Sequence, residues 1–318
     1  MILITGASGF VGRALVARLA SDRVSMRACV RRPDIAMPEG VQTIQITDLS
    51  AELNWQEALV DVSVIVHAAA RVHVMDDAAA DPLSEFRRIN VAGTLNMATQ
   101  AAAAGVSRFV FISSIKVNGE ETVHGRPFSA SDAPAPLDAY GISKMEAEEG
   151  LRDIARRTGM EIVIIRPPLV YGPGVKANFQ AMMRWLDRGI PLPLGAIHNA
   201  RSLVALDNLV ALIVACISHP AAANQTFLVS DGEDLSTTEL LRRMGRAMHR
   251  PARLIPLPTA LLRFGAWIVG KPAIGQRLCG SLQVDISKTK ELLAWNPPLS
   301  VDEGLRKAAG DYRSETSI

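Results

Sequence analysis

Three glycines directly after the first apolar run constrain the fold of this chain more than any other feature. Residues 2–15 read ILITGASGFVGRAL, which places Gly6, Gly9 and Gly12 between a strand pattern and a helical pattern. Glycine lacks a Cβ, so a turn here can be tight and can leave backbone N–H groups facing a ligand. The helix that follows adds unpaired N–H donors and a positive dipole end, which suit a pyrophosphate. The pattern predicts a dinucleotide-binding turn, although its first gap is one residue longer than in G-x-G-x-x-G.

Strand and helix patterns alternate through the first two-thirds of the chain. The predicted strands are 2–5, 25–30, 41–46, 62–69, 108–113 and 161–167, and the predicted helices are 10–20, 83–104 and 139–158. This alternation is typical of an α/β protein with a Rossmann-type doubly wound parallel sheet. We expect residues 1–167, with part of about 200–230, to form an NAD(P)-binding domain. The remaining segments of 168–318 are expected to form a smaller C-terminal α/β substrate domain.

Composition excludes several classes of partner. The 318 residues carry a formal net charge of only +2, so nothing indicates nucleic-acid binding. The three cysteines form no C-x-x-C pair, which argues against a disulfide framework or a metal site and favours the cytoplasm. The most apolar later segment, 254–270, is interrupted by Pro256, Pro258 and Arg263, so it predicts a buried or partner-facing helix and no membrane span. We therefore expect no nucleic-acid, membrane or metal partner.

The end of the second predicted strand bears on the cofactor. A carboxylate at this place would bind the ribose 2′-hydroxyl of NAD, whereas an arginine accommodates the 2′-phosphate of NADP. The chain has Arg31 and Arg32 there, with Asp34 close behind. An arginine can hold a phosphate with two hydrogen bonds. The sequence thus favours NADP(H) over NAD(H).

A tyrosine and a lysine are placed to exchange a proton with a substrate. Tyr140 and Lys144 are four residues apart in a predicted helix, so they share one face. An ammonium near a phenol favours the phenolate and lowers the phenol's pKa, which lets it act as an acid or base. Ser114 lies in the turn after the fifth predicted strand, at the edge of the sheet where ligands bind.

These motifs together resemble the extended short-chain dehydrogenase/reductase family, in its NAD-dependent epimerase/dehydratase branch. The resemblance covers nearly the whole chain and implies that Ser114, Tyr140 and Lys144 are the catalytic residues. It also implies contacts to the cofactor from a set of residues near the ends of the strands. Besides the three glycines, these are Phe10, Val11, Arg31, Arg32, Asp48, Leu49, Ala68, Ala69, Ala70, Asn90, Tyr140, Lys144 and Pro167.

The resemblance also implies how a nucleotide sugar would be bound. Asn178 and Arg201 match residues near the diphosphate, and Leu192 begins a segment, LPLG, that matches the strand beside the base. Ser114 would position the sugar oxygen. Lys116 stands where the family usually has a small residue, so it would either approach the sugar or diphosphate or point to solvent.

The function implied by the resemblance is NAD(P)H-dependent chemistry on a UDP-sugar in surface-polysaccharide biosynthesis. Because the arginines favour NADPH, we expect reduction of the C4 ketone of a UDP-4-keto-6-deoxy-HexNAc. The alternatives are a UDP-glucose or UDP-GlcNAc 4-epimerase, a reductase of hydrophobic ketones and a non-catalytic NADP-binding sensor. The family often forms dimers through its two long helices, here 83–104 and 139–158, so we also expect a homodimer.

Overall fold

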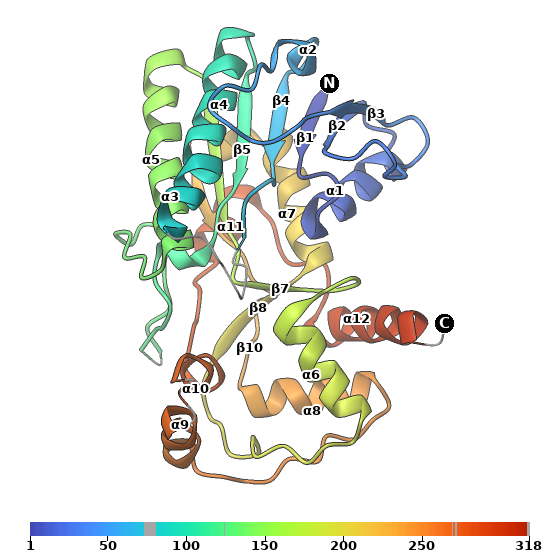
Figure 1. Cartoon of the computed structure of the whole chain (residues 1–318), viewed down its shortest axis with the longest axis vertical. Helices are drawn as coiled ribbons and strands as arrows, with labels where there is room; N and C mark the ends of the chain where they lie inside the picture. The colour runs from blue at the N-terminus through green and yellow to red at the C-terminus, as the bar shows by residue number, and fades with distance from the viewer. Residues whose placement is uncertain (73–80, 124, 269, 271, 317–318) are drawn as a thin grey trace.

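A seven-stranded parallel sheet organises the larger part of the molecule (Figure 1). The computed structural model describes residues 1–72, 81–123, 125–268, 270 and 272–316. The strand order is β3-β2-β1-β4-β5-β6-β9, and every neighbouring pair is parallel. The strands are β1 (Ile2–Thr5), β2 (Met26–Val30), β3 (Gln42–Gln45), β4 (Val64–His67), β5 (Arg108–Ile112), β6 (Glu161–Arg166) and β9 (Thr226–Leu228). The predicted Rossmann-type sheet is confirmed.

Helices cover both faces of this sheet, as an all-parallel sheet requires. One face packs on α1 (Phe10–Ser21) and α7 (Leu206–Ser218), and the other on α4 (Thr94–Ala103) and α5 (Ala139–Thr158). The central strands consequently have no polar face: Phe109, Val110 and Phe111 of β5 are all fully buried. The shorter helices α2 (Gln56–Leu59), α3 (Pro82–Phe86) and α11 (Ser287–Leu293) complete these layers.

A second, three-stranded sheet lies below the first in the view of Figure 1. It consists of β7 (Leu169–Tyr171), β8 (Arg201–Ala205) and β10 (Asp234–Leu235), with β8 in the middle. The helices of this region are α6 (Ala177–Asp187), α8 (Thr237–Ala247), α9 (Thr259–Ile268), α10 (Pro272–Cys279) and α12 (Val301–Thr316). Ser236 accepts a hydrogen bond from the Glu239 N–H and caps α8, as its sequence pattern predicts.

The predicted helix 83–104 is interrupted, which corrects the sequence-based expectation. The chain forms α3, then a π-helical turn over Arg87–Gly93, and only then α4. A Cβ on Gly93 would lie 3.0 Å from the Leu49 carbonyl carbon, so this turn packs closely on the segment after β3. Such π-helical turns often occur at functional sites.

The described residues hold neither a bilayer-crossing helix nor a group of His, Cys, Asp and Glu arranged for a metal ion. Cys29, Cys216 and Cys279 are free thiols. Burial raises the pKa of both Cys29 and Cys216 to about 12, so these two thiols are not prepared for chemistry.

Candidate active site

The glycine turn forms a cradle in which Cβ atoms would not fit. Gly6 has a φ of +67°, and a Cβ there would lie 2.7 Å from the Ala69 backbone nitrogen. A Cβ on Gly12 would lie 2.1 Å from the Gly6 carbonyl oxygen. Gly9 is the N-cap of α1, yet no side chain caps the helix and no acidic residue occupies its first turn. These features fit the pyrophosphate of a dinucleotide, because the helix start offers free N–H donors and a partial positive charge. Phe10 and Val11 lie in that first turn.

The residues after β2 and β3 are expected to contact the adenosine end of the cofactor. Arg31 and Arg32 directly follow β2 and are exposed, with the Arg31 carbonyl accepting a bond from Gln45. Asp48 accepts a bond from the Leu49 N–H and pairs with Arg88 of the π-helical turn. The structure does not test their roles in cofactor binding.

Buried polar groups fix the end of β4 beneath the expected nicotinamide ribose site. His67 is fully buried, and its ring nitrogens share hydrogen bonds with the hydroxyls of Thr5 and Thr94. Burial, helped by the charge of Lys144, lowers the pKa of His67 to about 3, so the ring is neutral. It therefore joins β1, β4 and α4 without adding charge. The half-buried Ala68, Ala69 and Ala70 follow it.

Asn90 connects this loop to α5. Its amide oxygen accepts from the Arg71 N–H, and its NH₂ group donates to the Arg71 carbonyl and the Ser143 hydroxyl. Asn90 is nearly fully buried in the π-helical turn. The structure thus gives Asn90 a clear role in positioning the loop after β4.

Ser114 follows β5 and caps a 3-10 turn, Ile115–Val117, with its hydroxyl oxygen accepting from the Lys116 N–H. The Ile115 N–H donates to the Pro167 carbonyl, so this turn is tied to the end of β6. The first turn of α5 packs against it: a Cβ on Gly141 would lie 2.9 Å from the Lys116 carbonyl oxygen. The serine turn and the Tyr140 turn are therefore neighbours.

Tyr140 and Lys144 lie in the first two turns of α5, and Lys144 is buried. The Lys144 ammonium donates to the Ile112 carbonyl at 2.9 Å and lies 4.4 Å from the Phe111 ring centroid. It is 5.9 Å from the Tyr140 ring centroid, and that ring meets Phe86 edge-on. The predicted sharing of one helix face is confirmed.

The electrostatics of this pair differ from the sequence-based expectation. Burial, together with the Asp138 charge, raises the pKa of Tyr140 above its usual 10, and burial lowers the pKa of Lys144 to about 7. Loss of water is the main influence on the Tyr140 pKa in this structure, and the lowering of that pKa by Lys144 stays a prediction. Burial therefore disfavours the charged form of both side chains.

A buried network of hydrogen bonds and ion pairs around Glu148 was not predicted from the sequence. Glu148 accepts from the Ser113 hydroxyl at 2.6 Å and from Arg166 at 2.5 and 2.9 Å. Arg166 also donates to Asn118, and Glu148 has a second cation partner, Arg152. The signal was present, because Glu148 continues the spacing of Tyr140 and Lys144 by four more residues.

The Lys116 ammonium forms ion pairs with neighbouring carboxylates. Its ammonium pairs with Asp138 and Glu120, and its side chain is partly buried. Asp138 is also the N-cap of α5, accepting from the Gly141 N–H at 2.7 Å. Lys116 is thus an ion-pair partner at the start of α5, which differs from the solvent-facing option, and its approach to the sugar or diphosphate stays a prediction.

The residues expected to bind the nucleotide sugar come from the second sheet region. Arg201 begins β8 and donates to the Gly280 carbonyl, while Asn178 is exposed at the start of α6. Leu192 is buried and exchanges backbone bonds with Arg253 and Ile255. The structure gives their places and leaves their contacts to substrate as a proposal.

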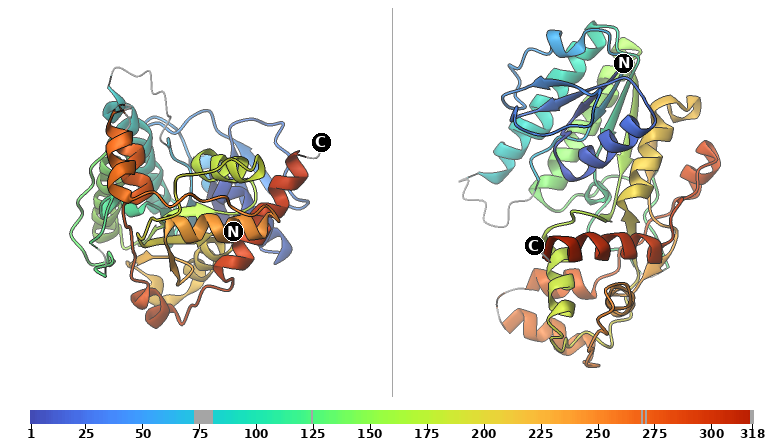
Figure 2. Two further views of the ribbon diagram at one scale, coloured as in Figure 1. Left: turned by 90° about the horizontal axis from the view of Figure 1, so that it is seen from below. Right: turned by 90° about the vertical axis from the view of Figure 1, so that its right-hand side faces the viewer.

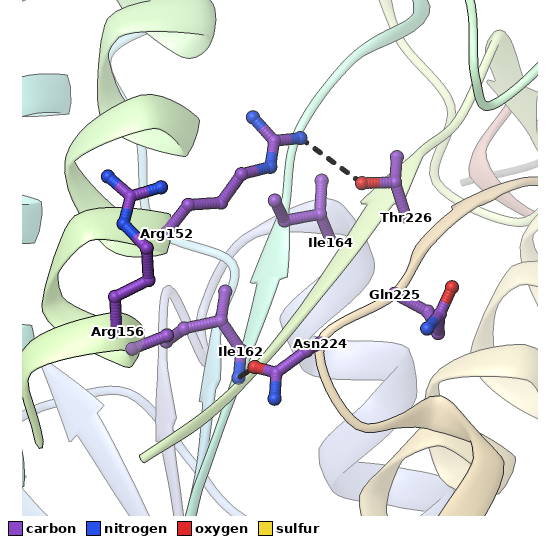
Figure 3. A pocket seen from close by; sticks show the side chains of 8 residues that line it. Arg152, Arg156, Ile162, Ile164, Asn224, Gln225 and Thr226 are labelled. Atoms are coloured by element: carbon purple, nitrogen blue, oxygen red, sulfur yellow. Dashed lines mark hydrogen bonds between the residues drawn. The ribbon is translucent and has the colours of Figure 1, made fainter. Parts of the chain in front are cut away.

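A separate hollow of about 310 Å³ lies along the far half of α5 (Figure 3). Arg152 and Arg156 extend from α5 on one side, and Thr226, which Arg152 contacts, lies on the other. The hollow is beyond Lys144 along α5 and next to the edge strand β9, so it is distinct from the candidate active site.

Two relatives, both named as 4-epimerases, align with nearly the whole chain. The chain is 50% identical over 311 residues to a UDP-glucose 4-epimerase of Vibrio cholerae, covering 97% of this chain and 94% of the relative. It is 26% identical to an N-acetyl-alpha-D-glucosaminyl-diphospho-ditrans,octacis-undecaprenol 4-epimerase of Escherichia coli O157:H7, covering 96% and 92%.

Solved structures show the same fold. The UDP-glucose 4-epimerase of Thermotoga maritima with UDP-glucose has a TM-score of 0.78 at 21% identity, with 99% of both chains covered. The UDP-glucuronic acid 4-epimerase of Bacillus cereus in complex with NAD has a TM-score of 0.79 at 20% identity and the same coverage. The model of the NAD dependent epimerase/dehydratase family matches residues 2–230. The chain therefore belongs to the NAD-dependent epimerase/dehydratase family.

Proposed function

We propose that this protein is an NAD-dependent 4-epimerase of a UDP-linked hexose or N-acetylhexosamine. The observation that carries the proposal is the 50% identity to a UDP-glucose 4-epimerase over 97% of the chain. This reverses the order of preference from the sequence alone, which placed a 4-ketoreductase first and an epimerase second. NAD in the structural neighbour from Bacillus cereus supports NAD over the NADP(H) that the sequence favoured.

In this reaction the chain's own residues handle the proton and the orientation of the sugar. The bound nicotinamide supplies a hydride acceptor and donor. Tyr140 removes the proton from the C4 hydroxyl and returns it when the opposite configuration forms. The Ser114 hydroxyl orients the same oxygen. Because burial raises the Tyr140 pKa, its deprotonation needs a nearby positive charge, and the Lys144 ammonium would provide one.

The second sheet region selects the substrate in this proposal. Arg201 binds the diphosphate with charge-assisted hydrogen bonds and Asn178 contributes a polar contact. Leu192 packs beside the base. We assign this role to residues 168–318 apart from the segments that join the large sheet, and the cofactor to residues 1–167 with those segments.

A 4-ketoreductase using NADPH is the second candidate. One observation favours it: the two exposed side chains after β2 are Arg31 and Arg32, where a carboxylate would suit NAD. A net reductase must exchange its cofactor in each turnover, whereas an epimerase keeps NAD bound and regains its hydride.

Two assays separate the candidates. Purified protein is incubated with UDP-glucose or UDP-GlcNAc without added reductant, and formation of the 4-epimer is followed by chromatography. In parallel, loss of NADPH absorbance is followed with a UDP-4-keto-6-deoxy-HexNAc. Epimer formation without NADPH consumption supports the proposal. NADPH consumption without epimer formation contradicts it.

We also propose the setting of this activity. The relative that acts on a diphospho-undecaprenol sugar favours a role in surface-polysaccharide synthesis in the cytoplasm. A homodimer through α4 and α5 is proposed as well, and light scattering combined with size-exclusion chromatography tests it.

A further inference from the structure

Helix α9 turns its apolar side chains outward. Leu261, Phe264, Trp267 and Ile268 are all more than half exposed, with Trp267 at 67%, and Ile255 just before the helix is exposed too. The sequence predicted a buried or partner-facing helix here. Contiguous exposed apolar residues of this kind mark interaction sites, whereas isolated ones need no explanation.

The spacing of these residues gives α9 one outward apolar face. Leu261, Phe264 and Ile268 are three and four residues apart and so lie in one row. Trp267 stacks on Phe264 with ring centroids 6.1 Å apart, which widens the row. The half-buried Leu262 instead packs against the core of the second sheet region. Helix α9 therefore packs a small apolar area against the protein and exposes a larger apolar face to solvent.

The chain segment that contains α9 carries cationic side chains and no acidic ones. The sequence has no Asp or Glu between Glu239 and Asp285, although the whole chain is nearly neutral at +2. Arg253, shortly before α9, and Arg263, within it, are both exposed. Aromatic and aliphatic side chains flanked by cations are the pattern of helices that lie in the interface of an anionic bilayer.

Helices α9 and α10 pack side by side at the end of the molecule farthest from the amino terminus (Figures 1 and 2). In this position a flat surface could meet α9 without touching the large sheet. A second copy of the chain fits less well. A two-fold interface would place this face on itself and bring its cations together, and residues 240–284 supply no carboxylate to pair with them.

We propose that the outward face of α9 docks on the surface of an anionic lipid bilayer. Phe264 and Trp267 enter the boundary between headgroups and acyl chains, and the neighbouring basic residues contact the headgroups. The inference departs from the expectation of no membrane partner, which considered only spanning segments. It is independent of the proposed sugar chemistry.

Docking would place the nucleotide-sugar region close to the bilayer. The segment after α10 returns to the second sheet: the Gly280 carbonyl accepts from Asn199 and Arg201, and the Leu278 carbonyl accepts from Asn199 and Thr237. These bonds join the end of α10, which packs against α9, to the start of β8 and to α8.

Vesicle co-sedimentation of the full chain tests the proposal. Vesicles of phosphatidylcholine alone are compared with vesicles containing phosphatidylglycerol, at low and high salt. The variants are the double change Phe264→Ser with Trp267→Ser, the charge change Arg263→Glu, and the control Val60→Ser. Val60 is 55% exposed and follows α2 in the large-sheet region.

We expect the wild type and Val60→Ser to bind anionic vesicles, with weaker binding to neutral vesicles and at high salt. The double variant should lose about tenfold or more in partition coefficient, and Arg263→Glu a smaller factor, while circular dichroism and turnover of a soluble UDP-sugar stay unchanged. Absence of wild-type binding at low salt, or equal binding by the double variant, overturns the proposal. A wild-type dimer that the double variant dissociates also overturns it, because the face is then an interface between copies.

Discussion

Two neighbouring charged groups of helix α5, Glu148 and Lys144, are both buried but differ in how many partners they have. Around Glu148, the carboxylate is fully buried and receives hydrogen bonds from Ser113, Arg152 and Arg166. One turn earlier, the partners of the buried Lys144 ammonium among the described residues are the Ile112 carbonyl and the rings of Phe111 and Tyr140, and burial lowers its pKa to about 7. A buried charge with several partners holds structure together, whereas one with few is available for chemistry.

We call the part with Tyr140 and Lys144 the reactive side, because its residues are the candidates for chemistry. The part with Glu148 and Arg166 is the supporting side, because its residues hold the others in place. Glu148 holds Ser113, which precedes the catalytic candidate Ser114, and Arg166 continues the network to Asn118. On the reactive side, burial raises the pKa of Tyr140. Substitutions on the two sides should therefore affect turnover and stability in different proportions.

The largest effect on turnover is expected from Tyr140→Phe. Removing the proton-transfer group should lower kcat by about 10²–10⁴-fold, while the urea midpoint stays close to that of the wild type. Tyr171→Phe is the matched control. Its hydroxyl donates to the buried Asp231, so its loss should cost about 1–3 kcal/mol of unfolding free energy and leave kcat per folded molecule unchanged. Turnover by Tyr140→Phe at the wild-type rate would remove the acid/base assignment.

The largest effect on stability is expected from Glu148→Gln. The change leaves the Arg166 guanidinium buried without its carboxylate, which should cost about 3–5 kcal/mol in urea unfolding. Asp153→Asn, on the same helix, breaks only exposed pairs with Arg156 and Arg157 and should cost less than about 1 kcal/mol. Equal costs for the two variants would show that the buried network is not the stabilising feature.

The sequence predicted the reactive side of this comparison better than the supporting side. The glycine turn and the Tyr140–Lys144 face depend on local spacing, which a sequence displays directly. The spacing places Glu148 on the same helix face as Tyr140 and Lys144, but its partner Arg166 comes from β6, so no local pattern reveals the pair. The burial that raises the Tyr140 pKa likewise depends on packing, which residue spacing does not show.

The helical segments show the same limit. Residues 83–104 have a continuous helical pattern, and the π-helical turn at Arg87–Gly93 accompanies the close packing of Gly93 on Leu49. The second sheet has strands of two to five residues, too short for a period to be recognised. Which apolar side chains of α9 are exposed depends on which side of the helix packs against the protein. The sequence alone therefore could not decide between a buried and a partner-facing helix.

A smaller effect, on the pH dependence of stability, is expected from Lys144→Met. The folded pKa of about 7 lies below the unfolded value of 10.5, so between these values the unfolded chain binds more protons and the unfolding free energy rises with pH. Between pH 7 and 9, Lys144 should contribute a rise of up to about 1.4 kcal/mol per pH unit, which Lys144→Met lacks. The exposed Lys290→Met should keep the wild-type slope. Urea unfolding at several pH values measures this, and equal slopes in all three proteins would contradict a buried, depressed Lys144.

The smallest effect is expected from Asp138→Asn. Asparagine can still cap α5 at the Gly141 N–H, so the helix is retained, but the negative charge that helps to raise the Tyr140 pKa is lost. The acid limb of kcat/KM should therefore move to lower pH, by a few tenths of a unit. Asp207→Asn is the control, because it breaks a comparable pair with Lys307 outside the candidate site. If the acid limb moves upward, or moves equally in the control, the Asp138 charge is not acting on Tyr140, and the reactive side is governed by burial alone.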